Sequence, residues 1–266
     1  MNSNSPLGPH LEDLWQAIEP LLPGFTVELL SSVDSTNSEL MRRVRAGSIE
    51  PVLLAADAQT AGRGRMGKGW HSQAGQSLTF SLALPMAPAH WSGLSLAVGA
   101  SLAESLHPEV RLKWPNDLWL HGRKLGGILV ETAHQGESAQ QPRMVVIGVG
   151  INIARPEAAA VAAASATPAP VLAAGLAEIC IGQTVGETLA MVAPALVRDV
   201  LRFEVEGFAA FAERFKARDA LQGRMVTLSD GSPGRADGVD ATGALRVQTD
   251  TGLRVVSSAE VSVRPC

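Results

Sequence analysis

Apolar and polar positions follow two different periods along this chain. Apolar residues recur at helical spacing over residues 11–22, 36–47 and 91–106, and one or two longer helices are predicted within 186–218. Short apolar runs of strand length lie between them, at residues 25–30, 52–59, 78–84, 111–114, 118–120, 125–132 and 145–153. Elements in this order predict an α+β fold in which helices flank a mixed β-sheet.

The C-terminal part of the chain has a different pattern. From Leu221 onward the apolar runs are short, and turn pairs such as Asp230-Gly231 separate them. This spacing is typical of a small antiparallel β-barrel. We therefore predict two domains, at residues 1–220 and 221–266.

Two segments carry further local signals. Thr36 and Glu39 fit a capping box at the start of the second predicted helix, and Gly47 ends that helix. The alanine-rich residues 154–174 contain three prolines, which interrupt helices, so short helices and loops are expected there.

Composition describes an ordinary globular protein, with 266 residues of which 46% are hydrophobic. Cys180 and Cys266 show neither a disulfide framework nor metal-ligand spacing. Residues 1–41 lack the Lys and Arg of a signal peptide, and no apolar run has membrane-spanning length. We expect a cytoplasmic protein without a membrane partner.

Charge is distributed unevenly along the chain. The net charge of -4 argues against bulk binding of nucleic acid. Residues 42–124 nevertheless hold ten Lys and Arg against five Asp and Glu, whereas residues 1–41 hold none against six. Positive charge is therefore concentrated in one segment.

That segment contains a glycine-rich stretch at residues 57–71. Glycines let the backbone come close to a ligand, and the cations between them suit phosphate or carboxylate. The residues concerned are Gly62, Arg63, Gly64, Arg65, Gly67, Lys68 and Gly69. We predict an irregular loop that covers a small anion, and the alternative is a solvated surface turn.

Two phosphate-binding motifs match this stretch superficially. Gly62-x-Gly64-x-x-Gly67 fits the dinucleotide fingerprint, and Gly62 with Gly67-Lys68 fits most of a P-loop. Both motifs require a helix that begins at the glycines. No helical period follows here, and Gly69 stands where a P-loop needs Ser or Thr. Neither motif is therefore predicted.

Four segments are predicted to form one site at the strand ends of the sheet. They are Ser35-Thr36-Asn37, residues 59–70, Lys113-Trp114-Pro115-Asn116-Asp117 with Arg123-Lys124-Leu125-Gly126-Gly127, and Gly148-Val149-Gly150-Ile151-Asn152. In this combination the chain resembles the biotin protein ligases over about residues 32–153, and residues 222–266 match that family's C-terminal domain in position and size. The resemblance implies the class II synthetase-like fold of biotin and lipoate ligases, with a small SH3-like barrel.

The resemblance also implies an activity. The protein would join biotin to ATP as biotinyl-5′-adenylate, with Mg²⁺, and transfer biotin to one lysine of the biotin carboxyl carrier domain of acetyl-CoA carboxylase. The implied catalytic residues are Lys124, Arg63, Arg65, Asp117 and Lys113. The implied biotin contacts are Ser35, Thr36, Asn37, Gln59, Gly62, Arg63, Gly64, Arg65, Lys124, Gly127 and Gly148, and the implied nucleotide contacts are Arg65, Trp70, Asn116, Lys124 and Asn152.

The residue types suit this chemistry. A mixed anhydride brings two anions together, so cations are needed at the phosphorus oxygens. Lys124 would bridge the biotin carboxylate and the α-phosphate, Trp70 would stack on adenine, and the strand glycines Gly127, Gly148 and Gly150 would leave room for the biotin ring and tail.

Several assignments have alternatives. Asp117 could orient Mg²⁺ on the phosphates or accept a proton from the attacking lysine, and the base role is preferred slightly. Asn116 and Asp117 could instead cap the turn after Pro115, and Thr36 could serve only its helix. Trp114 and Trp119 are expected in the core.

Other functions remain to be compared with a biotin ligase. A lipoate or octanoate ligase shares the fold, and a noncatalytic biotin-binding regulator would lack the cationic set that this chain keeps. About 30 residues precede Ser32, too few for a helix-turn-helix domain, so we expect no DNA partner. The expected state is a monomer or weak homodimer.

Overall fold

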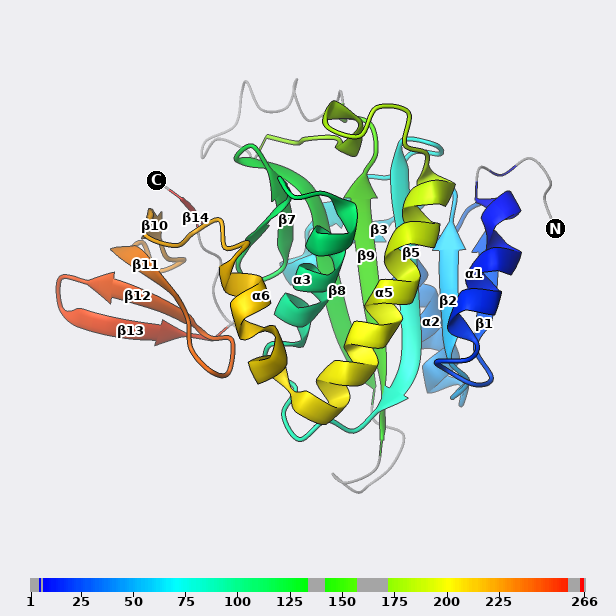
Figure 1. Ribbon diagram of the computed structural model, residues 1–266, viewed down its shortest axis with the longest axis horizontal. Helices are drawn as coiled ribbons and strands as arrows, with labels where there is room; N and C mark the ends of the chain where they lie inside the picture. Colours follow the sequence, from blue (N-terminus) through cyan, green and yellow to red (C-terminus); the bar gives the residue numbers. More distant parts are fainter. Residues whose placement is uncertain (1–4, 6, 134–141, 157–171, 258–263, 266) are drawn as a thin grey trace.

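A seven-stranded β-sheet forms the centre of the larger part of the molecule (Figure 1). Its order is β1-β2-β5-β9-β8-β7-β6; β1 and β2 are parallel and the other neighbours antiparallel, so the sheet is mixed, as predicted. The strands are β1 (Thr26–Leu30), β2 (Val52–Ala56), β5 (Ser77–Met86), β6 (Arg111–Lys113), β7 (Asp117–Leu120), β8 (Arg123–Ala133) and β9 (Arg143–Asn152). The structure, a computed structural model, describes residues 5, 7–133, 142–156, 172–257 and 264–265.

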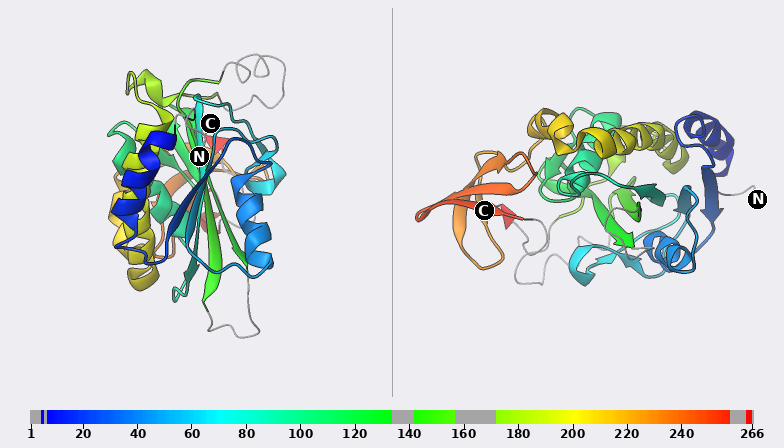
Figure 2. Two further views of the ribbon diagram at one scale, coloured as in Figure 1. Left: turned by 90° about the vertical axis from the view of Figure 1, so that its right-hand side faces the viewer. Right: turned by 90° about the horizontal axis from the view of Figure 1, so that it is seen from below.

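Helices cover both faces of this sheet (Figure 2). The helices α1 (Leu11–Ile18), α3 (Leu94–Leu106) and α5 (Val185–Glu206) pack on one face, and α2 (Thr36–Arg45) packs on the other. Because side chains alternate along a strand, Leu53 joins the core beneath the first three helices and Leu54 the core beneath α2. Burial on both faces explains why the strands read as continuous apolar runs.

The start of α2 differs from the predicted cap. Ser35 is the N-cap residue, and its Oγ accepts a hydrogen bond of 3.4 Å from the Ser38 N–H. Glu39 pairs with arginines further along the helix instead of folding back. The prediction of Thr36 as the cap is wrong because its buried hydroxyl faces the sheet, 2.7 Å from Ser81 Oγ.

The C-terminal residues form a second sheet of five antiparallel strands, as predicted. Its order is β13-β12-β11-β10-β14. The strands are β10 (Met225–Thr227), β11 (Pro233–Val239), β12 (Leu245–Thr249), β13 (Gly252–Val256) and β14 (Arg264–Pro265). Gly231 and Gly243 at two predicted turns have φ angles of 85° and 81°, a region that glycine occupies without strain.

Contacts join the two sheets. Residues 218–220 run alongside β6, where Leu112 both donates and accepts a backbone hydrogen bond of 2.8 Å. Trp114 is fully buried, as expected, and its Nε1–H donates to Gly243 O at 3.0 Å. The division at residue 220 stays a prediction.

The other predicted elements can be compared directly. The helices α5 and α6 (Ala212–Lys216) confirm the prediction for residues 186–218. Most of the alanine-rich tract, 157–171, lies outside the described residues. Among the helices of the described segments, none combines the length and the apolar character needed to cross a membrane.

Candidate active site

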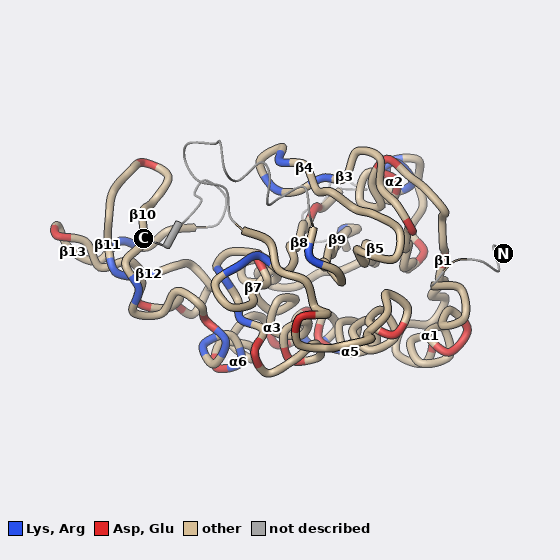
Figure 3. Tube along the Cα trace, turned by 90° about the horizontal axis from the view of Figure 1, so that it is seen from above, with Lys and Arg blue, Asp and Glu red and all other residues tan. Residues whose placement is uncertain are grey.

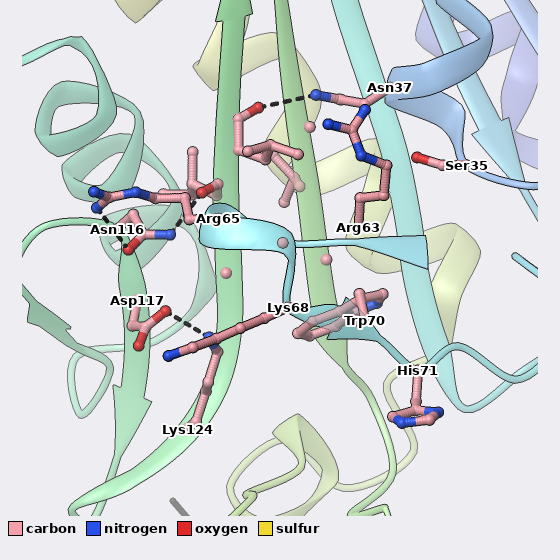
Figure 4. Close-up of a pocket in the computed structure, with 18 of the residues that line it drawn as sticks. Ser35, Asn37, Arg63, Arg65, Lys68, Trp70, His71, Asn116, Asp117 and Lys124 are labelled. Atoms are coloured by element: carbon pink, nitrogen blue, oxygen red, sulfur yellow. Dashed lines mark hydrogen bonds and ion pairs between the residues drawn. The ribbon is translucent and has the colours of Figure 1, made fainter. Parts of the chain in front are cut away.

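A cavity of about 580 Å³ opens on the α2 face of the central sheet, beneath the glycine-rich segment (Figure 4). The residues predicted from four separate segments converge on it. Its lining includes Ser35, Thr36, Asn37, Gln59, Arg63, Gly64, Arg65, Trp70, Lys113, Asn116, Asp117, Lys124, Gly127, Gly148 and Asn152. Gly62 is not in the lining; a Cβ there would stand 3.0 Å from Gln59 Nε2, so it supports a lining residue instead.

The glycine-rich segment is a β-hairpin, so the expectation of an irregular loop is wrong. The strand β3 (Gly62–Arg63) pairs with β4 (Gly69–Trp70), and residues 65–67 form one 3₁₀ turn at the tip. The Gly64 N–H donates to Lys68 O at 2.7 Å, which closes the hairpin. No α-helix begins at these glycines, all of which are described, so neither phosphate-binding motif applies.

Positive charge dominates the cavity. Among its described lining residues, Asp117 is the sole carboxylate. The cations of the lining are Arg63, Arg65, Lys68, Lys113 and Lys124. Figure 3 shows the basic positions on the hairpin and on the strands beneath it, whereas α1 carries acidic ones. This imbalance suits a ligand with more than one negative charge.

Asp117 and two lysines form the centre of the site. Lys113 and Asp117 are cross-strand partners on β6 and β7, and Gly127 of β8 lies opposite Asp117. Lys124 Nζ lies 2.6 Å from Asp117 Oδ1, and Lys113 Nζ lies 3.9 Å from Asp117 Oδ2. A Cβ on Gly127 would stand 3.4 Å from the Lys124 ammonium, so a small residue there suits this arrangement.

Asn116 connects the centre to the hairpin. Its Nδ2 donates to Ile128 O at 2.8 Å, and its backbone oxygen accepts from the Ile128 N–H at 2.9 Å. Its Oδ1 accepts from Arg65 at 3.4 Å. Burial lowers the pKa of the Arg65 guanidinium from its ordinary value, and the charge of Asp117 opposes that shift. Asn116 and Asp117 therefore contact a neighbouring strand and cations of the cavity. A role limited to capping the turn after Pro115 would not include these contacts.

A chain of hydrogen bonds lines the opposite end of the cavity. Ser81 Oγ, fully buried on β5, lies 2.7 Å from Thr36 Oγ1 and 2.6 Å from Asn37 Oδ1. Since an amide oxygen only accepts, Ser81 donates its single proton to Asn37 and accepts from Thr36. The Asn37 Nδ2 donates in turn to Glu131 at 3.0 Å. The Thr36 hydroxyl is the end of this chain that lies next to Gln59.

Gln59 completes this end of the cavity. Its Oε1 accepts from the Thr36 N–H at 2.7 Å and lies 3.2 Å from Thr36 Oγ1. Because Oε1 is occupied, the Nε2 amide is the group that Gln59 can offer to a ligand. One donor and one acceptor thus stand side by side at this end of the cavity.

Arg63 holds the hairpin to this end. It donates to Ser38 Oγ at 3.2 Å and pairs with Glu131 at 3.1 Å. Arg63 on β3 and Arg65 at the tip therefore hold the hairpin at two places, the first to Ser38 and Glu131 and the second to Asn116.

Two predicted nucleotide contacts lie at the β9 wall. Trp70 lies on the backbone of Gly150, where a Cβ would come within 2.5 Å of the indole ring. Its buried Nε1 has no partner among the described residues. Asn152 donates to Ala174 O at 3.1 Å. Their contacts with a nucleotide stay predictions, and so does the room for biotin at Gly148, where Asn37 lies in the structure.

Sequence reasoning missed Ser81 and Glu131. Ser81 lies in an apolar strand outside the quoted motifs, whereas Glu131 lies eight residues after Arg123 on the motif's own strand and was given no role. No spacing rule identifies either residue. A buried hydroxyl within an apolar strand is the signal that could have drawn attention to Ser81, because such a group needs a partner.

The predicted Mg²⁺ contact at Asp117 stays a prediction. Among the described residues, no three His, Cys, Asp or Glu side chains cluster in the way a metal ion needs. Asp117, the predicted contact for Mg²⁺, is already engaged by Lys124 and lies beside Lys113.

Two family models match the chain. The biotin/lipoate A/B protein ligase family matches residues 29–152, and the biotin protein ligase C terminal domain matches residues 223–264. The chain is 36% identical over 255 residues to the bifunctional ligase/repressor BirA of Escherichia coli. This match covers 91% of this chain and 75% of that protein. The chain belongs to the biotin protein ligase family.

Other members of this family support the assignment. The biotin–[acetyl-CoA-carboxylase] ligase of Paracoccus denitrificans is 33% identical over 243 residues, covering 88% of this chain and 98% of that protein. The biotin protein ligase of Aquifex aeolicus, solved in complex with biotin and ATP, superposes with a TM-score of 0.72 at 27% identity, covering 90% of this chain and 99% of that one. The family resemblance drawn from the motifs is confirmed, and so is the fold class.

Proposed function

We propose that this chain activates biotin with ATP as biotinyl-5′-adenylate and transfers biotin to a lysine of a carrier protein. Membership of the biotin protein ligase family supports the reaction class. Within the site, one observation carries the proposal: Lys124 Nζ lies 2.6 Å from Asp117 Oδ1 in a cavity that is otherwise cationic. The Lys124 ammonium, which can pair with an anion, and the Asp117 carboxylate, which can accept a proton, lie side by side there.

The first step joins the two substrates. A carboxylate oxygen of biotin attacks the α-phosphorus of ATP, and the bond from that phosphorus to the bridging oxygen breaks, which releases pyrophosphate. Negative charge grows on the phosphoryl oxygens, and fixed cations in a partly buried site stabilise it. The residues proposed for this role are Lys124, Arg63, Arg65 and Lys113.

The second step transfers the acyl group. The neutral amine of the acceptor lysine attacks the acyl carbon, the bond to the AMP oxygen breaks, and the amine loses a proton. Asp117 is the lining carboxylate available to accept that proton. We favour this base role over a metal role because Lys124 and Lys113 already surround its two oxygens.

Biotin is proposed to bind with its cyclic urea at Thr36 and Gln59. Thr36 offers lone pairs to a urea N–H, and Gln59 Nε2 offers a donor to the urea oxygen. Ser35 and Asn37 support this end, and Arg65, Trp70, Asn116 and Asn152 are proposed for the nucleotide.

The proposed partners follow from the relatives. The acceptor is the biotin carboxyl carrier domain of acetyl-CoA carboxylase, as the name of the Paracoccus relative suggests. Mg²⁺ is proposed to arrive on the phosphates of ATP, because the described residues offer no metal cluster. The expected monomer or weak homodimer can be checked by analytical ultracentrifugation.

DNA binding is a separate matter, since the Escherichia coli relative is named as both ligase and repressor. With a net charge of -4, we expect no sequence-specific DNA complex at physiological salt. A gel shift with operator-like DNA, with and without biotin and ATP, checks this expectation.

The proposal is tested by measuring pyrophosphate release from ATP with biotin, lipoate or octanoate, without any carrier. Biotin alone should support release. Release with lipoate or octanoate but not with biotin would favour the other branch of the family, whose model covers both kinds of ligase. A lack of release with all three acids, together with tight binding of biotin, would favour a noncatalytic regulator.

A further inference from the structure

A second cavity, of about 450 Å³, lies next to the β6–β7 hairpin. Arg111 and Trp119 line it, and they are cross-strand partners two residues along each strand from the Lys113 and Asp117 pair. Because side chains alternate along a strand, all four project from the same face. The second cavity therefore lies on the same strand face as the proposed base, beside residues that lead into the C-terminal sheet.

Lys113 is the side chain between the two cavities. Its Nζ lies 3.9 Å from Asp117 Oδ2 and 5.5 Å from the centre of the Trp119 ring. A polypeptide that brings a lysine amine to Asp117 therefore passes close to Trp119. The opposite wall is formed by residues that lead into the C-terminal sheet, namely Asp219, Ala220, Gln222 and Arg224.

Two of the residues that line this second cavity each carry a buried polar atom without a partner among the described residues. Trp119 is only 5% exposed, and its Nε1–H has no acceptor. Asp219 Oδ2 is buried without a donor, although its Oδ1 accepts from the Leu221 N–H at 2.8 Å. Buried polar groups are normally satisfied. An unpaired donor and an unpaired acceptor in one cavity match a peptide group, which presents one oxygen and one N–H.

The charges around the second cavity favour a neutral ligand. Arg111 and Arg224 are balanced by Asp219 and Glu109, and Glu109 is itself paired with His121 at 2.6 Å. A phosphate or a carboxylate would therefore find no excess of positive charge, in contrast to the first cavity. Burial also raises the pKa of Asp219, although backbone hydrogen bonds from Leu221 and Gln222 oppose that shift.

We propose that the second cavity binds the main chain of the protein substrate beside its acceptor lysine. Trp119 donates to a backbone carbonyl and Asp219 accepts from a backbone N–H of that segment. The proposal rests on the proposed ligase function and adds a binding site for the carrier. Trp119 and Asp219 position the carrier and do not touch the reacting atoms.

Two variants test this site. Trp119→Phe removes the donor and keeps the ring, and Asp219→Asn removes the charge of the acceptor. Both should raise the KM for a biotin-accepting carrier domain about tenfold, the effect of about 1.4 kcal/mol from one lost hydrogen bond. Pyrophosphate release without carrier, in which hydroxylamine captures the adenylate, should stay within twofold of the unmodified protein. Trp15→Phe, which loses an indole N–H bonded to Phe25 O, is the matched control.

An unchanged KM for the carrier in both variants would overturn the proposal. So would an equal loss of carrier-free pyrophosphate release, because the residues would then serve the first cavity. If the unmodified protein releases no pyrophosphate with biotin, the ligase function itself fails, and that outcome is distinct.

A binding measurement on the unmodified chain covers the case in which a variant fails to fold. The chain has five tryptophans and hence five indole N–H signals in a ¹⁵N-edited NMR spectrum. The Trp119 signal, identified by its loss in Trp119→Phe or by backbone assignment, should shift downfield on titration with a carrier whose acceptor lysine is changed to Arg. A Trp119 signal that does not move when other signals report binding contradicts the proposal.

Discussion

At the scale of single residues, Lys124 has the most sharply defined role. Its ammonium stands beside Asp117 where two anions are proposed to meet. Lys124→Ala should reduce biotin-dependent pyrophosphate release by about 10²-fold or more, as expected for loss of a preorganised charge at the transition state. Lys124→Arg should not restore the rate fully, because a planar guanidinium does not replace a compact ammonium.

The matched control for Lys124 is Lys216→Ala, which removes an exposed lysine of α6. That variant should release pyrophosphate at the rate of the unmodified protein. A rate within threefold of unmodified for Lys124→Ala would remove this residue from the proposed catalytic set.

Ser81 gives a second prediction at this scale. It sets the direction of the hydrogen bonds that leave the lone pairs of Thr36 available. Ser81→Ala should raise the KM for biotin about tenfold, within the range of about 1–3 kcal/mol for an unsatisfied buried group, and leave the KM for ATP unchanged. Steady-state kinetics with each substrate varied separately provide the measurement.

Ser105→Ala is the control for Ser81, because its hydroxyl bonds within α3 on the other face of the sheet. Equal increases in the KM for biotin and for ATP would mean that Ser81→Ala disturbs the whole sheet rather than one end of the cavity.

Single residues also show how far the sequence could lead. Lys124, Asp117 and Asn116 were predictable because they lie in a compact motif whose residue types fit the chemistry. Ser81 and Glu131 were not, because their importance depends on which strands lie side by side. Ser81 pairs with Gly148 and so faces Asn37, and this register cannot be read from one strand alone.

At the scale of elements, apolar periodicity predicted every strand of the central sheet and the α-helices that pack on it. It did not predict the helix cap or the hairpin in the polar segments. The cap of α2 was misplaced by one residue because Thr36 bonds to the sheet. The glycine-rich stretch was predicted to be irregular, yet Gly62 pairs with Trp70 and Arg63 with Gly69. Glycines give no apolar period, so the sequence contains no signal for this pairing.

The hairpin gives a prediction of its own. Arg65 is half-buried at its tip, beside Asn116 and over the cationic centre. Arg65→Gly should still form the adenylate but hold it less well, because the hairpin then loses a contact that closes the cavity over the intermediate. Released adenylate acylates lysines of other proteins, so labelling of a bystander protein such as albumin should rise at least severalfold.

Met66→Gly is the control for the hairpin. Met66 is 65% exposed and has a φ of 56°, so glycine suits its backbone without removing a charge. Labelling of the bystander by Met66→Gly should stay at the unmodified level. Equal labelling by both variants would assign the effect to flexibility of the hairpin rather than to the Arg65 charge.

At the scale of the whole molecule, the chain joins a large mixed sheet to a small antiparallel one. The change of pattern at Leu221 predicted the second sheet. It did not predict that residues 218–220 pair with β6, since these residues have neither a strand period nor a turn signal. The end of the first proposed domain is thus held to β6 by backbone hydrogen bonds, and Asp219 lies in the middle of this contact.

Asp219 gives a prediction about stability. Burial raises its pKa above the unfolded value of 3.8, so its contribution is fully present below that pH and is lost as pH rises through the folded pKa. Asp219→Asn cannot titrate and escapes this loss. At pH 7 the variant should melt about 2–4 °C higher than the unmodified protein, the shift that about 1 kcal/mol produces in a chain of this size. The difference should close below about pH 4.

Calorimetry at pH 7 and pH 4 measures this effect, with Asp237→Asn as the control, because Asp237 is half-exposed and paired with Arg246. A lower melting temperature for Asp219→Asn at pH 7 would mean that the carboxylate is stabilised in the folded protein. Addition of a carrier domain extends the measurement. If Asp219 accepts a backbone N–H from the carrier, the carrier should raise the melting temperature of the unmodified protein more than that of Asp219→Asn, because Asp219 Oδ2 then gains a donor that it lacks among the described residues.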